Sequence, residues 1–188
     1  MSATQRRRDL IDAAKALILE EGPHAVTARK ITDRAGASLA ALHYAFRDLD
    51  ELLHQAHIEV LQGLFDGIFE RVRTDQGLRV FIEDVLHSFW RFLRTDEANA
   101  LAFFETFVSL MRPHRALGTV EVGQQRLVEL MTEAQQHNPE PSRTPIPQLA
   151  ALVLMAGDGL SLIHLGRRDE AATARELTHL IDAIQHLV

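Results

Sequence analysis

Apolar residues recur at helical spacing along nearly the whole chain, and no segment alternates apolar and polar positions as a half-buried strand does. The first apolar face is formed by Leu10, Ala13, Ala14, Leu17 and Ile18. Gly22-Pro23 should end the helix that carries it, because proline cannot continue a helix and glycine favours its end. The pattern therefore predicts an all-α protein.

Two short helices follow within the first fifty residues. Thr27 can cap a helix that runs to about Arg34, where Gly36 breaks it, since glycine turns sharply without strain. Ser38 can cap the next helix, which should end near Phe46. The N-terminal part is thus expected to hold three helices, with a tight turn between the second and third.

A long helix is predicted from Asp48 to Arg73. Asp48 and Glu51 form a D-x-x-E cap, and an apolar stripe continues to Val72. At about 1.5 Å per residue such a helix is about 39 Å long, enough to connect two domains rigidly.

Five more helices are expected after it. Their approximate bounds are 78–93, 96–113, 114–137, 148–165 and 169–187. The segment "NPEPSRTPIP" at 138–147 holds four of the six prolines and is predicted to be a loop. About nine helices result, three short ones and then six of ordinary or greater length.

Composition and charge narrow the function classes. With 188 residues, of which 46% are hydrophobic and 24% charged, the chain suits one or two small globular domains. It has no cysteine, which excludes disulfides and thiolate sites and suits a reducing cytoplasm. We expect no secretory signal in "MSATQRRRDL" and no membrane span, because no run of 18 apolar residues occurs.

The net charge of −6 is unevenly distributed. Residues 1–50 hold eight Lys and Arg against seven Asp and Glu, whereas residues 51–188 hold 12 against 19. A nearly neutral N-terminal segment followed by an acidic remainder is compatible with a small DNA-binding segment joined to a sensing domain.

The segment "TARKITDRAGASLAALHYAF" has the length and the small-residue turn of a helix-turn-helix. Ala35, Gly36 and Ala37 let the two helices cross closely, and the apolar residues of the flanking helices can anchor both to a core. Geometry alone leaves open a tight helical corner with no role in DNA binding.

Residues 8–53, about a quarter of the chain, resemble the Tet repressor (TetR) family of transcriptional regulators. The matching positions are Ala13, Ala14, Gly22, Thr27, Ile31, Ala35, Gly36, Ser38, Leu42, Phe46 and Leu52. The variant "LHYAF" at 42–46 is similar to one branch of the family. Beyond this segment the chain resembles the family only in its architecture and in "DGL" at 158–160.

The resemblance implies a homodimer that reads a near-palindromic, double-stranded operator DNA. It implies a helix-turn-helix DNA-binding domain at 1–52 and an effector-binding and dimerisation domain of about six helices at 53–188. The helix at 38–44 would lie in the major groove. The DNA-contacting residues it implies are Thr27, Arg29, Lys30, Ser38, Leu39, Ala40, Ala41, His43, Tyr44 and Arg47.

The chain departs from the family pattern at Leu49, where most members carry a phosphate-binding lysine. The groove-facing side chains of residues 39–41 also lack hydrogen-bonding groups, so we expect readout through thymine methyls, DNA shape and Arg29 toward a guanine. His43 and Tyr44 are the better candidates for phosphate contacts. Alternatively, Leu49 is an inward anchor and Arg47 supplies the missing charge.

Eight of the nine phenylalanines and the single tryptophan lie between Phe65 and Phe107. Most of these must be core, but the resemblance implies a cavity among the middle helices for a small apolar or aromatic effector, whose binding would release a repressor from DNA. The expected effector-binding residues are Phe65, Phe69, His87, Trp90, Phe103, Glu105, Thr106, Phe107, Ser109 and His164.

The last two helices are more apolar than a monomer surface allows, which favours a four-helix interface between two copies. The expected interface residues are Leu152, Met155, Ile163, Leu177, Ile181 and Ile184.

Other function classes have less support in the sequence. His54 and His57 have a spacing that could share a metal, but no third ligand is identifiable, so we expect no metal site and no cofactor. No catalytic motif occurs, so we expect no enzyme. The alternative to a regulator is a helical small-molecule- or metal-binding bundle that no longer binds DNA.

Overall fold

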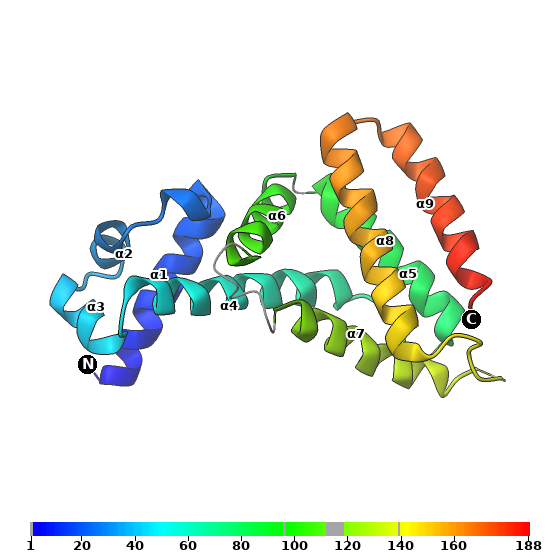
Figure 1. The fold of residues 1–188 in the computed structure, drawn as a ribbon, viewed down its shortest axis with the longest axis horizontal. Helices are drawn as coiled ribbons and strands as arrows, with labels where there is room; N and C mark the ends of the chain where they lie inside the picture. The colour runs from blue at the N-terminus through cyan, green and yellow to red at the C-terminus, as the bar shows by residue number, and fades with distance from the viewer. Residues whose placement is uncertain (1, 96, 112–118, 139) are drawn as a thin grey trace. The chain divides into compact units, whose positions relative to one another are not determined.

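The computed structural model describes residues 2–95, 97–111, 119–138 and 140–188. Side chains at 97–99, 109–111 and 119–122 are not described. The described residues contain helices and no strand, which confirms the all-α prediction (Figure 1). The helices are α1 (Ala3–Glu21), a 3-10 turn (Pro23–Ala25), α2 (Ala28–Arg34), α3 (Leu39–Ala45), α4 (Leu49–Phe69), α5 (Leu78–Thr95), α6 (Glu97–Met111), α7 (Thr119–Gln135), α8 (Ile146–Arg167) and α9 (Glu170–Gln185).

Two helix bounds differ from the predictions for a physical reason. α4 ends at Phe69, and its 21 residues make it about 32 Å long rather than 39 Å. Beyond it, Arg73 leaves the helical path and donates to Asp84 of α5 through Nε at 2.8 Å and Nη2 at 2.9 Å. α8 starts at Ile146 with Pro147 in its first turn, where a missing N–H costs nothing.

One further helix can be compared only in part. α7 begins at Thr119. The predicted start at residue 114 lies outside the described residues.

The chain divides by packing into two compact units. The first consists of Met1–Leu64 and Ala98–Thr119, and the second of Phe65–Glu97 and Val120–Val188. α4 therefore contributes residues 49–64 to the first unit and 65–69 to the second. The predicted boundary at residue 52 divides the chain by function, into a DNA-binding part and an effector-binding part, and not by packing. It stays a prediction.

Each unit has its own apolar core. The N-terminal core, in the first unit, consists of Leu10, Ile11, Ala13, Ala14, Leu17, Ile18, Val26, Ile31, Leu42, Phe46, Leu52, Ala56 and Val60. The C-terminal core, in the second, consists of Ile68, Phe69, Leu78, Phe81, Ile82, Val85, Leu86, Phe89, Leu127, Met131, Ala134, Leu149, Ala150, Val153, Leu154, Leu160, Leu177, Ile181 and Ile184.

In the second unit, α5, α8 and α9 pack on one another (Figure 1). Gly157 permits the close approach of α8 to α5, since a Cβ at this position would lie only 2.9 Å from Cδ2 of Phe89. α8 is also the one described helix that is long and apolar enough to cross a bilayer. That is weak evidence for a membrane span, because a core helix passes the same test, and α8 contributes Val153 and Leu160 to the C-terminal core.

Candidate nucleic-acid interface and ligand cavity

The two helices of the predicted helix-turn-helix start on side-chain caps. Thr27 Oγ1 accepts a hydrogen bond from the Lys30 N–H at 3.3 Å, and Ser38 Oγ accepts one from the Ala41 N–H at 3.1 Å. Both caps satisfy N–H groups that a helix start leaves unpaired. The predicted starts of α2 and α3 are thus confirmed.

The turn between α2 and α3 closes as a Schellman motif. Gly36 has φ +58°, its N–H donates to the Asp33 carbonyl at 3.3 Å, and the Ala37 N–H donates to the Thr32 carbonyl at 2.9 Å. This pair of bonds requires a left-handed residue in the Gly36 position. The turn fixes the direction in which α3 leaves α2.

Gly36→Ala should lower the free energy of unfolding by about 1–2 kcal/mol. A Cβ at Gly36 would meet open space, so only the left-handed backbone of this residue contributes to the cost. Urea unfolding monitored by circular dichroism measures the change. Gly63→Ala, in the middle of α4 and also facing open space, is the control and should not destabilise the protein.

α3 is fastened to the N-terminal core on one side only. Leu42 is fully buried and Phe46 is 2% exposed, as their spacing predicts. On the other side the side chains of Leu39 and Tyr44 are 52% and 87% exposed. Ser38, Ala40 and His43 are exposed too, and Ala41 is half-buried. The outward face of α3 thus matches the part of the sequence predicted to enter the major groove.

A residue outside the predicted set also holds α3. The guanidinium of Arg7 lies 4.0 Å from the centroid of the Phe46 ring, and it donates to the carbonyl of Ala45 and to Glu51 Oε1, the latter at 3.0 Å. Arg7 therefore ties the end of α3 to the start of α4. Sequence reasoning missed it because an arginine on a polar helix face is normally solvated.

The basic side chains near the turn differ in how free they are to meet DNA. The Arg29 side chain is 92% exposed, with only a 3.8 Å contact to Asp33. Lys30 is committed within the protein, through Nζ to Glu21 Oε2 at 2.5 Å and to the Ala25 carbonyl at 3.0 Å. Of the two, Arg29 is the better placed to bind DNA.

Leu49, the departure from the family pattern, packs partly buried against the N-terminal core. Its neighbour Arg47 has a 78% exposed side chain, paired with Asp48 at 3.1 Å. Asp48 caps α4 by accepting from the Glu51 N–H at 2.8 Å, and Glu51 accepts from the Arg47 N–H at 2.9 Å, so the predicted D-x-x-E cap is confirmed. The position of Leu49 fits the inward-anchor alternative.

Comparison with known proteins agrees with this geometry. Residues 10–56 match the family described as bacterial regulatory proteins, tetR family. This segment, about a quarter of the chain, is therefore similar to the tetR family. The chain is 38% identical over 115 residues to the HTH-type nicotine-responsive transcriptional repressor HdnoR of Paenarthrobacter nicotinovorans, a match that covers 61% of this chain and 59% of the relative.

A second relative is the HTH-type transcriptional regulator BetI of Escherichia coli, strain K12 / DH10B, 37% identical over 69 residues. That match covers 37% of this chain and 35% of BetI, so this chain covers less than two thirds of the length of either relative.

Solved structures extend the likeness in fold to nearly the whole chain. The multidrug binding protein EbrR, complexed with imidazole, superposes with a TM-score of 0.72 at 20% identity, over 94% of this chain and 89% of its own. A tetR-family transcriptional regulator from Streptomyces coelicolor superposes with a TM-score of 0.69 at 17% identity. That match covers 100% of this chain and 82% of the Streptomyces chain. At these identities the likeness concerns the fold alone.

The expected effector residues fall into both packing units. In the second unit, the Phe65 and Phe69 rings stack with centroids 6.0 Å apart, and Trp90 meets His164 edge-on at 4.9 Å. In the first unit, on α6, the Phe103 and Phe107 rings lie 6.4 Å apart and Glu105 is half-buried. The structure groups these residues within each unit, and their joint role as one pocket stays a prediction.

Two residues of the α6 set need separate mention. Thr106 is fully buried, and its Oγ1 has no hydrogen-bond partner among the described residues. Burying a hydroxyl without a hydrogen-bond partner costs free energy, and a polar group of a ligand could offset this cost by bonding to it. The side chain of Ser109 lies outside the described residues.

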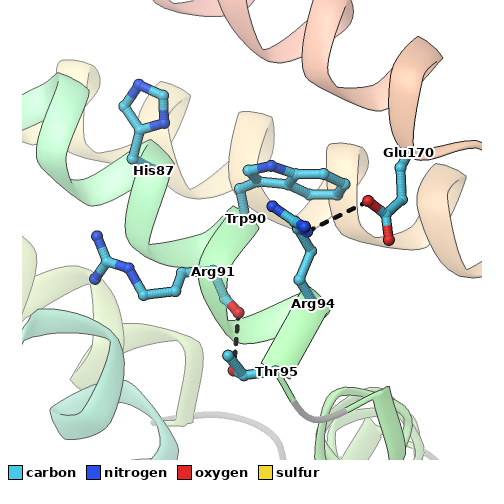
Figure 2. Close-up of a pocket in the computed structure, with 6 residues that line it drawn as sticks. All are labelled: His87, Trp90, Arg91, Arg94, Thr95 and Glu170. Atoms are coloured by element: carbon cyan, nitrogen blue, oxygen red, sulfur yellow. Dashed lines mark hydrogen bonds and ion pairs between the residues drawn. The ribbon is translucent and has the colours of Figure 1, made fainter.

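A cavity of about 510 Å³ lies in the second unit at the C-terminal part of α5 and the start of α9 (Figure 2). It is lined by His87, Trp90, Arg91, Arg94, Thr95 and Glu170. His87 and Trp90 were expected at an effector site and the other four were not. Charged and polar residues on the polar face of a helix normally indicate solvent exposure, so no sequence signal distinguished them.

The expected dimer residues separate by helix. On α8, Leu152, Met155 and Ile163 are 38%, 61% and 44% exposed. On α9, Leu177, Ile181 and Ile184 belong instead to the C-terminal core, with at most 7% of each exposed. This is a correction, because a side chain enclosed by its own protomer cannot meet a partner. Leu162 of α8, 54% exposed, was missed.

His54 and His57 both lie on α4. Within the described ranges no group of three or more His, Cys, Asp or Glu side chains is arranged to hold a metal ion. His57 is 7% exposed, and its Nε2 has no described partner. Burial, and to a lesser degree the neighbouring His54, lowers the pKa of His57 to about 4. His57 is thus neutral at physiological pH and is a core residue.

Proposed function

We propose that this chain is a homodimeric, cytoplasmic transcriptional repressor that binds a near-palindromic operator and releases it when a small molecule binds. The observation that carries the proposal is the exposed face of α3, held in a fixed direction by the Gly36 turn and flanked by the exposed guanidinium of Arg29. A rigid helix that presents one face beside an exposed cation suits the major groove. The relatives named as a repressor and a regulator support the same role.

Release by a ligand has two supports. α4 belongs to both packing units, and its Phe69 lies in the C-terminal core with Phe89 of α5. A ligand that displaces this core would therefore move α4, and the displacement would be carried along the helix toward Leu52 in the N-terminal core. In a dimer this would change the spacing of two α3 helices, which must match the helical repeat of DNA. The names of the relatives add that HdnoR is nicotine-responsive and that EbrR has been crystallised with imidazole.

The alternative of a bundle that has lost DNA binding depended on Leu49 and on the lack of hydrogen-bonding side chains at residues 39–41. Because Leu49 packs against the N-terminal core and Arg47 beside it is exposed, the missing lysine no longer favours that alternative. Fluorescence anisotropy with labelled DNA from upstream of the gene tests the proposal. We expect sequence-selective binding at nanomolar concentration, and binding no tighter than to random DNA would contradict it.

Arg29→Ala should weaken operator binding by about 1–3 kcal/mol if this arginine contacts a guanine bidentately. Selectivity should relax at one base pair in each half-site. The measurement is anisotropy against a set of singly substituted operators. Arg126→Ala, which removes another exposed arginine on α7, is the control and should leave every affinity unchanged. An equal loss on all sequences would assign Arg29 to a phosphate instead.

A further inference from the structure

We propose that the cavity at α5 and α9 binds a small aromatic carboxylate, and that this compound is the class of effector that weakens operator binding. The inference rests on the proposed function, because it names the effector of that regulator. Its basis is that Arg91, Arg94 and the indole of Trp90 line the same cavity (Figure 2).

The cavity carries one positive charge that no described side chain neutralises. Arg94 Nε lies 3.4 Å from Glu170 Oε2, so these two charges compensate one another. Arg91 has no carboxylate within ion-pair distance among the residues that the structure describes. In Figure 2 its guanidinium points away from the Arg94–Glu170 pair. A carboxylate could therefore bind Arg91 without breaking an existing ion pair, and guanidinium groups bind carboxylates through two parallel hydrogen bonds.

The aromatic part of the ligand is suggested by Trp90. The indole meets the His164 ring edge-on at 4.9 Å, and His164 Nδ1 lies 3.0 Å from Thr173 Oγ1. These contacts with α8 and α9 hold the indole in one orientation. Trp90 lines the cavity, so the part of the indole that Arg94 does not cover offers apolar contact to a planar ring at little entropic cost.

The charges also argue against a cationic ligand. The natural place for a cation would be between the indole and Glu170, and Arg94 already occupies it, with its guanidinium carbon 5.6 Å from the Trp90 ring centroid. A cation would have to displace Arg94 and then remain close to both arginines. The cavity volume of about 510 Å³ lies within the range of small-molecule sites and accommodates a compound of one or two rings.

The test uses three one-ring probes of nearly the same shape, which are benzoate, neutral benzamide and cationic benzylamine. Trp90 is the only tryptophan of the chain, so intrinsic fluorescence reports on this cavity. Isothermal titration of the full chain gives the affinities independently. We expect saturable binding of benzoate with a change in Trp90 emission. Benzamide should bind about tenfold more weakly than benzoate, and benzylamine should bind no more tightly than benzamide. Benzoate should also lower operator affinity.

Arg91→Gln should weaken benzoate binding about tenfold and leave benzamide binding unchanged. The substitution removes no ion pair among the described residues, so the fold should be retained. Arg126→Gln is the matched control, because Arg126 is exposed on α7 and does not line the cavity. Its benzoate affinity should equal that of the unsubstituted protein.

Three outcomes would overturn the inference: no benzoate binding, benzoate affinity unchanged by Arg91→Gln, or benzylamine bound more tightly than benzoate. Benzoate binding with unchanged operator affinity would overturn the role of the cavity as the effector site. In all these cases selective DNA binding by the same preparation would leave the proposed function standing. Loss of selective DNA binding in the unliganded protein would contradict the proposed function itself.

Discussion

Leu162→Glu should convert the proposed dimer into monomers and lower operator affinity by about 10²–10⁴-fold, because each monomer then binds one half-site alone. Leu162 lies on a face of α8 that also carries Leu152, Met155 and Ile163, all at least 38% exposed. These positions recur at helical spacing, and between them Gly159 offers open space in which another helix can approach closely. A carboxylate buried in such an interface would have no partner, which is costly.

Sedimentation equilibrium at micromolar concentration measures the assembly, and anisotropy with operator DNA measures binding. Leu101→Glu is the control, because Leu101 is 51% exposed on α6 and not on α8. It should leave the dimer intact. Ile181→Glu would not serve, since this residue is 7% exposed in the C-terminal core and its substitution would unfold the protomer. A stable monomer of the unsubstituted protein would refute the interface.

His57 should contribute a loss of about 3 kcal/mol of stability as the pH is lowered from 6.5 to 4. Burial lowers the pKa of His57 from 6.5 to about 4 in the folded protein. Below pH 6.5 the unfolded chain therefore takes up a proton that the folded chain does not. The stabilisation is complete above pH 6.5 and is lost as the pH falls through the folded pKa.

The measurement is chemical unfolding at pH 4.0, 5.0, 6.0 and 7.5 for the unsubstituted protein and for His57→Leu. Asp158 affects the pH dependence of stability in the opposite direction, because burial raises its pKa to about 6. Both proteins contain Asp158, so the difference between their stability profiles isolates the contribution of His57. The variant should lose this part of the pH dependence. His43→Leu removes an exposed imidazole from α3 and is the control, whose pH profile should follow that of the unsubstituted protein. Identical profiles for His57→Leu and the unsubstituted protein would contradict the assignment.

Most of the local structure was determined by the sequence itself. The caps at Thr27, Ser38 and Asp48 and the turn at Gly36 were predictable because each depends on residues within a few positions of one another. Burial of the α3 anchors followed from spacing along one helix. The family resemblance of residues 8–53 was readable for the same reason, since its positions are set by these local requirements.

The functional surfaces were decided by tertiary structure. α8 and α9 are both apolar, and only their packing shows that Leu177, Ile181 and Ile184 face the protomer's own core while Met155 and Leu162 stay exposed. The cavity likewise exists because α5 and α9 pack together and bring Glu170 to Arg94. Helical periodicity fixes which residues share a face, but it cannot say what that face meets, because the partner is distant in the chain and the choice depends on how the whole core closes.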